Sequence, residues 1–165
     1  ELRIPKLNGV AVDLTALGSG TVITIITIIG ITFLWLNNDR LGVLYLATSS
    51  IGAGLWTLTL KQLIARDRPQ IVSRLVEVSN QSYPSGHSLS AAAMYLTLTF
   101  LVWRIYHGTR ARLVMLACCM CIVGSVSISR LYLGVHYPSD VASGVFLGFS
   151  WVLFITALFS RKAAR

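Results

Sequence analysis

Long apolar stretches, separated by short polar ones, run along most of this chain. A helix that crosses a lipid bilayer needs about 20 mostly apolar residues. Five stretches reach that length, and they cover residues 18–36, 41–65, 88–106, 113–134 and 141–160. The pattern predicts an all-α fold, a polytopic bundle of transmembrane helices. Residues 1–17 precede these stretches and are expected to form an entry segment lying at the membrane interface.

The composition supports the membrane class. Hydrophobic residues make up 55% of the chain and charged residues 12%, whereas soluble domains have roughly 45–50% and about 25%. The net charge of +8 raises the question of nucleic acid. The basic residues, however, lie between apolar stretches rather than in a stripe with interleaved aromatic residues, so no nucleic-acid binding is expected. Cys118, Cys119 and Cys121 share one apolar stretch and are interpreted as packing residues.

A single membrane-embedded domain covering residues 1–165 is expected. The chain starts at "ELRIPKLNG" without an initiator methionine or a signal-peptide pattern, so we expect an upstream first helix to be missing. With five spans, the turn at Arg40, the "RIYHGTRAR" loop and the "RKAAR" tail share one side. Seven basic residues lie on each side, and the other side keeps four when Lys61, Arg68 and Arg130 are assigned to chemistry, so that the rule places the first side in the cytoplasm. The loop 66–87 and the turn 130–140 then face outward together.

Three short segments hold most of the unusual residues. They are "KQLIARDRP" at 61–69, "PSGH" at 84–87 and "SRLYLGVHYPSD" at 129–140. The five-span topology places all three at the same membrane face, although they are far apart in the sequence. Because ionisable residues at membrane depth are costly and usually functional, this face is predicted to hold the functional site.

The cations of these segments predict an anion site. Lys61, Arg68 and Arg130 have few carboxylates nearby to neutralise them, and the planar guanidinium of arginine matches phosphate oxygens. Lys61 and Arg68 are seven residues apart, so they share one side if the helix continues. "PSGH" opens a helix, whose free N–H groups attract anions. Gly86 is expected to allow close approach of the backbone, and Ser85 to add a hydroxyl donor.

Two histidines supply candidate chemistry. Asp140 follows His136 by four residues and is expected to open the last helix and to hold one imidazole nitrogen, which fixes the tautomer. The other nitrogen can attack phosphorus, while His87 can donate a proton to the leaving group. Asp67 and Asp140 are the only aspartates near the site, too few for a two-metal centre, so no metal and no cofactor are predicted.

The pattern K-x6-R-P, then P-S-G-H, then S-R-x5-H-x3-D resembles the three-part signature of the type-2 phosphatidic acid phosphatase superfamily. It is most similar to the bacterial integral-membrane lipid phosphatase branch. The matching residues are Lys61, Arg68 and Pro69, then Pro84, Ser85, Gly86 and His87, then Ser129, Arg130, His136 and Asp140. The motifs cover about half the chain, residues 61–140, and the helical layout resembles the family over nearly all of it.

The resemblance implies a role for each residue. His136 is implied to be the nucleophile that forms a phosphohistidine, Asp140 to orient it, and His87 to protonate the leaving oxygen. The residues implied to hold the phosphate are Lys61, Arg68, Ser85, Gly86 and Arg130. The family core usually has six helices, and its members typically need no metal.

The predicted function is a membrane lipid phosphatase. Its substrate is expected to be a lipid phosphate or pyrophosphate such as undecaprenyl pyrophosphate, phosphatidylglycerol phosphate, phosphatidic acid or lipid A 1-phosphate. We expect it in the bacterial inner membrane, with its site facing the periplasm or cell exterior. Its expected partners are the lipid substrate and the bilayer, with no obligatory protein partner.

Alternative functions remain open at this stage. A lipid phosphotransferase would use the same intermediate. A non-enzymatic anion transporter would explain the cations but leaves His136 and Asp140 without a task. A vanadate-dependent haloperoxidase shares the family's site, but those relatives are soluble and five apolar spans argue against it.

Single residues also have simpler interpretations. "PSGH" alone can be a helix cap, and Arg130 alone can extend its side chain to the interface. Arg66 and Asp67 are expected to form a solvated surface pair. Arg74 and Glu77 are candidates for contact with the substrate head group.

Overall fold

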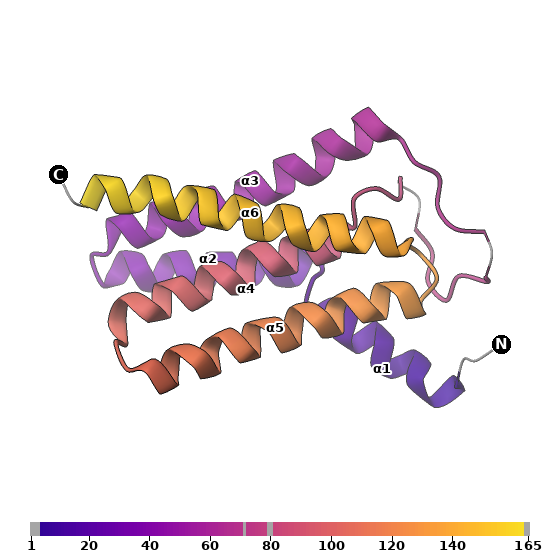
Figure 1. Cartoon of the computed structure of the whole chain (residues 1–165), viewed down its shortest axis with the longest axis horizontal. Helices are drawn as coiled ribbons and strands as arrows, with labels where there is room; N and C mark the ends of the chain where they lie inside the picture. The colour runs from indigo at the N-terminus through magenta and orange to yellow at the C-terminus, as the bar shows by residue number, and fades with distance from the viewer. Residues whose placement is uncertain (1–3, 71, 79–80, 164–165) are drawn as a thin grey trace.

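The computed structural model describes residues 4–70, 72–78 and 81–163, with side chains up to residue 159. The described residues form six α-helices: α1 (Pro5–Ala16), α2 (Gly20–Leu36), α3 (Arg40–Ile64), α4 (Gly86–Ile105), α5 (Thr109–Tyr132) and α6 (Pro138–Ala163). They pack as an elongated bundle in which α2 to α6 run roughly along its length (Figure 1). The predicted all-α class is therefore confirmed.

Five stretches of the described chain are long and apolar enough to cross a membrane. They are Pro5–Leu36, Arg40–Ile64, Gly86–Ile105, Thr109–Tyr132 and Pro138–Phe159. The largest difference from the predicted start of the last four is at α5, which begins at 109 rather than 113. Large apolar side chains such as Leu63 and Phe146 are 75% and 70% exposed. Such a surface is unusual for a soluble monomer and suits contact with lipid.

The N-terminal region, expected to be an entry segment at the membrane interface, is helical. Residues 5–16 form a regular helix, α1, and a turn at residues 17–19 separates it from α2. α1 packs against α5, and the hydroxyl of Tyr132 donates to the carbonyl of Ile4 and to the side chain of Asn8, both at 3.0 Å. Gly18 has to be small, because a Cβ there would lie 2.7 Å from the carbonyl oxygen of His87.

Helix α4 lies in the middle of the bundle, in contact with α3, α5 and α6. Its closest approach to α6 depends on Gly144 and Gly148, which are four residues apart and face α4. A Cβ on Gly144 would lie 2.7 Å from the carbonyl oxygen of Ser85, and one on Gly148 would lie 2.6 Å from that of Leu89. Small residues at this spacing let membrane helices approach closely. This packing holds the starts of α4 and α6 together.

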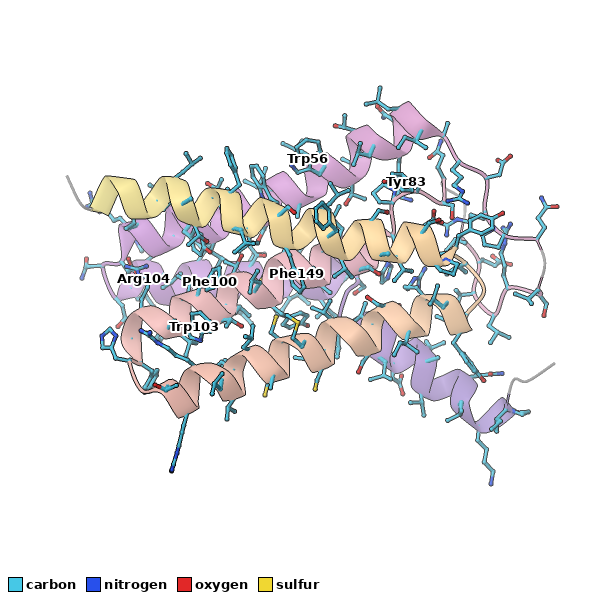
Figure 2. All side chains as sticks on the ribbon, in the orientation of Figure 1. Trp56, Tyr83, Phe100, Trp103, Arg104 and Phe149 are labelled. Carbon is cyan, nitrogen blue, oxygen red and sulfur yellow. The ribbon has the colours of Figure 1, made fainter. Side chains whose placement is uncertain are left out.

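The alternating helix directions bring distant segments to one end of the bundle. The α3–α4 loop, the α5–α6 turn and α1 all lie at the right-hand end of Figure 1. Tyr83 marks this end in Figure 2, and Trp103 and Arg104 mark the opposite one. The prediction that the three motifs share one end is confirmed.

Candidate active site

The first motif lies where α3 gives way to the α3–α4 loop. The helix ends at Ile64, and Ala65 takes a left-handed conformation with φ of 46°. The helix therefore does not continue to Arg68, and the condition under which Lys61 and Arg68 would share one side of a helix is not met. They converge instead on a loop carbonyl, because Lys61 Nζ and Arg68 Nη2 both donate to the main-chain oxygen of Gln81. Both side chains are buried.

The second motif forms the start of α4, as predicted. The hydroxyl of Ser85 accepts a hydrogen bond from the main-chain N–H of Ser88, and the N–H of Ser85 donates to the carbonyl of Asp140 at 2.9 Å. Gly86 also has a packing role, since a Cβ there would lie 3.0 Å from a methyl carbon of Thr57. His87 is half-buried.

His136 lies in the buried turn between α5 and α6. Its Nε2 is 3.4 Å from Arg68 Nη1, and Arg68 Nη1 also donates to the carbonyl of Val135 at 2.7 Å. On the other side of the ring, Nδ1 is 3.4 Å from the hydroxyl of Ser82 and 3.6 Å from Asp140 Oδ2. The last distance is too long for a hydrogen bond. Asp140 thus lies beside the expected imidazole nitrogen, at ion-pair rather than hydrogen-bond distance.

Asp140 is held by other groups. It lies in the first turn of α6, after the Pro138 start, and its Oδ2 accepts from the N–H of Tyr137 at 3.0 Å. Its Oδ1 accepts from Arg66 Nη1 at 2.8 Å, and the guanidinium of Arg66 lies 4.0 Å from the ring centre of Tyr137. The expected surface pair of Arg66 and Asp67 is therefore wrong, because Arg66 pairs with this buried carboxylate.

Arg130 is buried but only partly hydrogen-bonded. The residue is 3% exposed, and its Nη1 donates to the hydroxyl of Thr15 in α1 at 3.0 Å. Its Nε is buried and has no hydrogen-bond partner among the described residues. A buried donor without a partner is costly, so this N–H is suited to an anionic ligand.

The charges around His136 favour an anion and a neutral imidazole. Burial, followed by the charges of Arg68, Arg130 and Lys61, lowers the pKa of His136. Burial and the neighbouring Arg74 lower the pKa of Arg68. A neutral imidazole keeps a lone pair for attack, and the surrounding cations can neutralise phosphate oxygens.

The mouth of the site is polar. A cavity of about 290 Å³ lies beside Arg68. Its lining residues are Arg66, Asp67, Arg68, Gln70, Arg74, Val78 and Gln81. Arg74 is fixed at this mouth by two hydrogen bonds to the carbonyl of Pro69, whereas Glu77 lines a neighbouring cavity with Arg74.

The described residues contain no group of three or more His, Cys, Asp or Glu side chains that could hold a metal ion. The absence of a metal requirement stays a prediction.

Comparison with known proteins identifies the family. The sequence model of the PAP2 superfamily matches residues 42–164. The chain belongs to the PAP2 superfamily. The match begins within α3, so α1 and α2 lie outside the matched part.

Three curated relatives show what this PAP2 chain is similar to. It is 34% identical to phosphatidylglycerophosphatase B of Bacillus subtilis, over 99% of this chain and 80% of that protein. It is 29% identical to the lipid A 1-phosphatase of Rhizobium etli, over 69% of this chain and 48% of that protein. It is 39% identical to the undecaprenyl-diphosphatase of Sulfolobus acidocaldarius, over 47% of this chain and 33% of that protein.

Solved structures agree with the sequence relatives. The crystal structure of the transmembrane PAP2-type phosphatidylglycerolphosphate phosphatase from Bacillus subtilis matches with a TM-score of 0.85 and 32% identity, over 98% of this chain and 80% of that one. The crystal structure of Aquifex aeolicus LpxE matches with a TM-score of 0.74 and 25% identity, over 93% of this chain and 87% of that one. The predictions of an integral membrane protein of this family and of a lipid phosphatase are confirmed.

Proposed function

We propose that this PAP2 phosphatase removes phosphate from a membrane lipid through a phosphohistidine at His136. The observation that supports this most is the buried set of cations around His136, in which the buried Nε of Arg130 has no hydrogen-bond partner among the described residues. Cations buried without matching carboxylates are costly unless they bind an anion. A phosphate group supplies that anion.

The first step is attack by the imidazole. Nε2 is the nitrogen on the side of Arg68, so it forms the bond to phosphorus while the bond from phosphorus to the lipid oxygen breaks. Lys61, Arg68 and Arg130 neutralise the phosphoryl oxygens, together with the N–H of Gly86 at the start of α4 and the hydroxyl of Ser85. Catalysis of phosphoryl transfer depends mainly on such positioning and charge.

His87 handles the proton of the leaving group. In the first step it gives a proton to the departing lipid oxygen, which leaves as an alcohol or a lipid phosphate. In the second step a water attacks the phosphohistidine, the N–P bond breaks, and His87 takes back a proton from that water. The cycle ends with free phosphate and with both histidines in their starting states.

The relatives suggest the substrate class. Their names include a phosphatidylglycerophosphatase, a lipid A 1-phosphatase and an undecaprenyl-diphosphatase. We place phosphatidylglycerol phosphate first, because the phosphatidylglycerophosphatase B similarity extends over 99% of this chain. The exposed apolar helix surface supports delivery of such a lipid from the bilayer.

Phosphate release by the purified protein tests this function. Phosphatidylglycerol phosphate, phosphatidic acid, lipid A and undecaprenyl pyrophosphate are offered separately in excess EDTA, with His136→Ala as the control. We expect release from at least one lipid by the unaltered protein and a loss of activity in the variant. No release from any lipid would contradict the function. Transfer of the labelled phosphate to a second lipid instead of water would identify a phosphotransferase.

We further propose that the protein lies in the bacterial inner membrane with the site facing outward. Single cysteines at Gln81 and Thr109, introduced after replacement of the three native cysteines, lie at opposite ends of the bundle. A membrane-impermeant reagent added to intact cells should label Gln81→Cys and leave Thr109→Cys unlabelled. The reverse pattern, or labelling of both, would contradict this orientation.

A further inference from the structure

The hydroxyl of Ser82 lies between His136 and Asp140, two residues of the third motif. Its hydroxyl oxygen lies 2.5 Å from Asp140 Oδ2 and 3.4 Å from His136 Nδ1. The side chain is fully buried, with 0% exposure. The direct distance from His136 Nδ1 to Asp140 Oδ2 is 3.6 Å. The hydroxyl is therefore the group that connects the carboxylate to the imidazole by hydrogen-bond distances.

Arg68 and Asp140 determine which atom donates in each of these hydrogen bonds. A guanidinium can only donate, so His136 Nε2 is the acceptor in its 3.4 Å contact with Arg68. The ring proton of a neutral imidazole is then on Nδ1. At the other end an ionised carboxylate can only accept, so the hydroxyl of Ser82 donates to Asp140.

We propose that Ser82 is a positioning residue that links His136 to Asp140. The Nδ1–H of His136 donates to the hydroxyl of Ser82, and this hydroxyl donates to the carboxylate of Asp140. The proposal rests on the proposed function only in taking His136 as the nucleophile. When Nε2 bonds to phosphorus, the ring gains positive charge and its proton stays on Nδ1. Ser82 accepts from that N–H and donates to Asp140, so the negative carboxylate stabilises the charged ring without a proton changing place.

Neighbouring residues hold Asp140 and Ser82 in place. Arg66 and the N–H of Tyr137 hold the carboxylate of Asp140 in a position where its Oδ2 is 3.6 Å from His136 Nδ1. The main-chain N–H of Ser82 donates to the carbonyl of Arg66 at 2.8 Å, so the same loop residue positions Ser82 and Asp140.

Ser82→Ala tests the hydroxyl against a matched control. Ser49 is also fully buried, and its hydroxyl bonds Thr97 at 2.6 Å away from the three motifs. Ser49→Ala therefore measures the structural cost of losing a buried hydroxyl. We expect Ser82→Ala to slow formation of the phosphohistidine about tenfold with little change in KM, the size of one lost hydrogen bond. Ser49→Ala should stay within about twofold of the unaltered protein.

A spectroscopic readout separates this role from a purely structural one. In protein labelled with ¹⁵N-histidine, His136 should carry its proton on Nδ1, and Ser82→Ala should shift it toward a mixture of the two tautomers. Ser82→Thr, which keeps the hydroxyl, should restore the Nδ1–H tautomer and most of the rate, and it serves as the second variant if Ser82→Ala folds poorly.

An unchanged tautomer in Ser82→Ala, or a rate loss no greater than that of Ser49→Ala, would overturn the proposal. So would a Ser82→Thr protein that folds but behaves no better than Ser82→Ala. If the unaltered protein forms no phosphohistidine while the tautomer still responds to Ser82→Ala, the proposed function fails and the hydrogen-bond connection stands.

Discussion

The two ends of the bundle both carry arginines and a cavity, but in different surroundings. At the end away from the motifs, the exposed Arg104 donates to both carboxylate oxygens of Asp39, at 3.0 and 3.2 Å. At the motif end, the buried Arg130 bonds the neutral hydroxyl of Thr15 and has an unpaired Nε within the described structure. One arginine is neutralised by the protein itself, whereas the other is left to be neutralised by a ligand.

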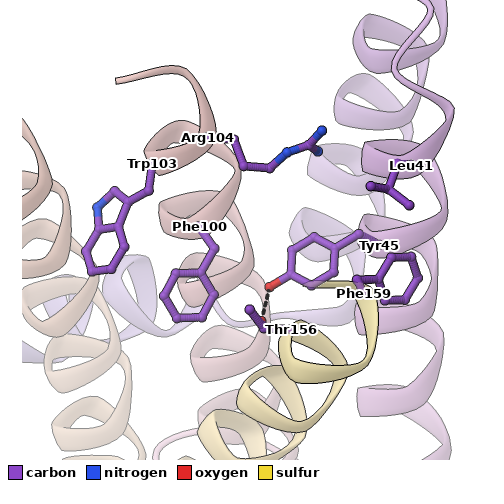
Figure 3. Close-up of a pocket in the computed structure, with 7 residues that line it drawn as sticks. All are labelled: Leu41, Tyr45, Phe100, Trp103, Arg104, Thr156 and Phe159. Atoms are coloured by element: carbon purple, nitrogen blue, oxygen red, sulfur yellow. Dashed lines mark hydrogen bonds between the residues drawn. The ribbon is translucent and has the colours of Figure 1, made fainter. Parts of the chain in front are cut away.

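The cavities at the two ends differ in polarity. The cavity at the Arg104 end, shown in Figure 3, has a volume of about 430 Å³ and is mostly apolar. It is lined by Leu41, Tyr45, Phe100, Trp103, Arg104, Thr156 and Phe159 from α3, α4 and α6. Tyr45 and Thr156 form a hydrogen bond of 2.7 Å in this cavity. The smaller cavity at the motif end is polar and adjoins Arg68. Convergent charged groups, rather than volume, distinguish the site that can bind phosphate.

His87 at the motif end and His107 at the other end give the comparison with the largest expected difference in activity. His87→Ala should lower turnover of an alkyl phosphate by about 10²–10⁴-fold, because a poor leaving group needs a proton. The loss should be much smaller for p-nitrophenyl phosphate, whose leaving group needs none. His107, exposed at the other end and bonded to Arg112 at 3.2 Å, supplies the control His107→Ala, expected to act like the unaltered protein on both. Equal losses on both substrates in His87→Ala, with a lowered melting temperature, would make His87 a structural helix residue.

Arg130 and Arg104, one at each end, give the next largest expected difference in kcat/KM. Arg130→Met keeps much of the side-chain volume but removes the charge, and should lower kcat/KM by at least about 100-fold, as for other donors to a transition-state anion. Arg104→Met breaks an exposed pair, and should leave kcat/KM within about twofold and cost no more than about 1 kcal/mol of stability. Steady-state kinetics and thermal unfolding measure both. Similar kinetic losses in the two variants would remove the distinction between the ends.

Thr15 tests whether α1 contributes to the site. Thr15→Val removes the hydrogen bond that fixes the guanidinium of Arg130, and we expect kcat/KM to fall about tenfold. Thr156→Val is the matched change at the other end, where it removes the bond from Tyr45. It should reduce thermal stability without a comparable kinetic loss. A Thr15→Val enzyme with unaltered kinetics would show that α1 has only a packing role.

The smallest expected change concerns pH. Because burial and the nearby cations lower the pKa of His136, its ring should stay neutral when the pH falls from 8 to 5. An ordinary histidine titrates near about 6.5 and would become mostly charged over this range. The ¹⁵N resonances of His136 should therefore show no titration step. A step with a midpoint of 6 or above would contradict the electrostatic description of the site.

Much of the fold is predictable from the pattern of apolar residues. Helices α3 to α6 each contain a stretch long enough to span the membrane, bounded by polar residues, and these were predicted within a few residues. Helix α1 was missed because "PKLNGVAVDLTA" includes Lys6, Asn8 and Asp13 among its apolar residues and shows no long apolar stretch. Its helical form is supported by packing on α5, which no local pattern reveals.

Some residues of the site were predictable from the sequence and others were not. The motif residues were found because their spacing is distinctive and the helix directions bring them together. Ser82, Arg66 and Thr15 were not found as site residues. Their contacts with Asp140 and Arg130 join positions 58, 74 and 115 residues apart. A single serine, arginine or threonine carries no signal of such a contact, although Ser82 lies just before "PSGH" and Arg66 lies inside the first motif.

Capture of the covalent intermediate tests the central claim most directly. The protein is mixed with a lipid phosphate labelled with ³²P in the scissile group, quenched in alkali, and digested for peptide mapping. The label should appear on the peptide that contains His136, remain detectable in His87→Ala when an aryl phosphate is the donor, and be absent from His136→Ala. A label on any other residue, or turnover above a few per cent in His136→Ala, would contradict the assignment of His136 as the nucleophile.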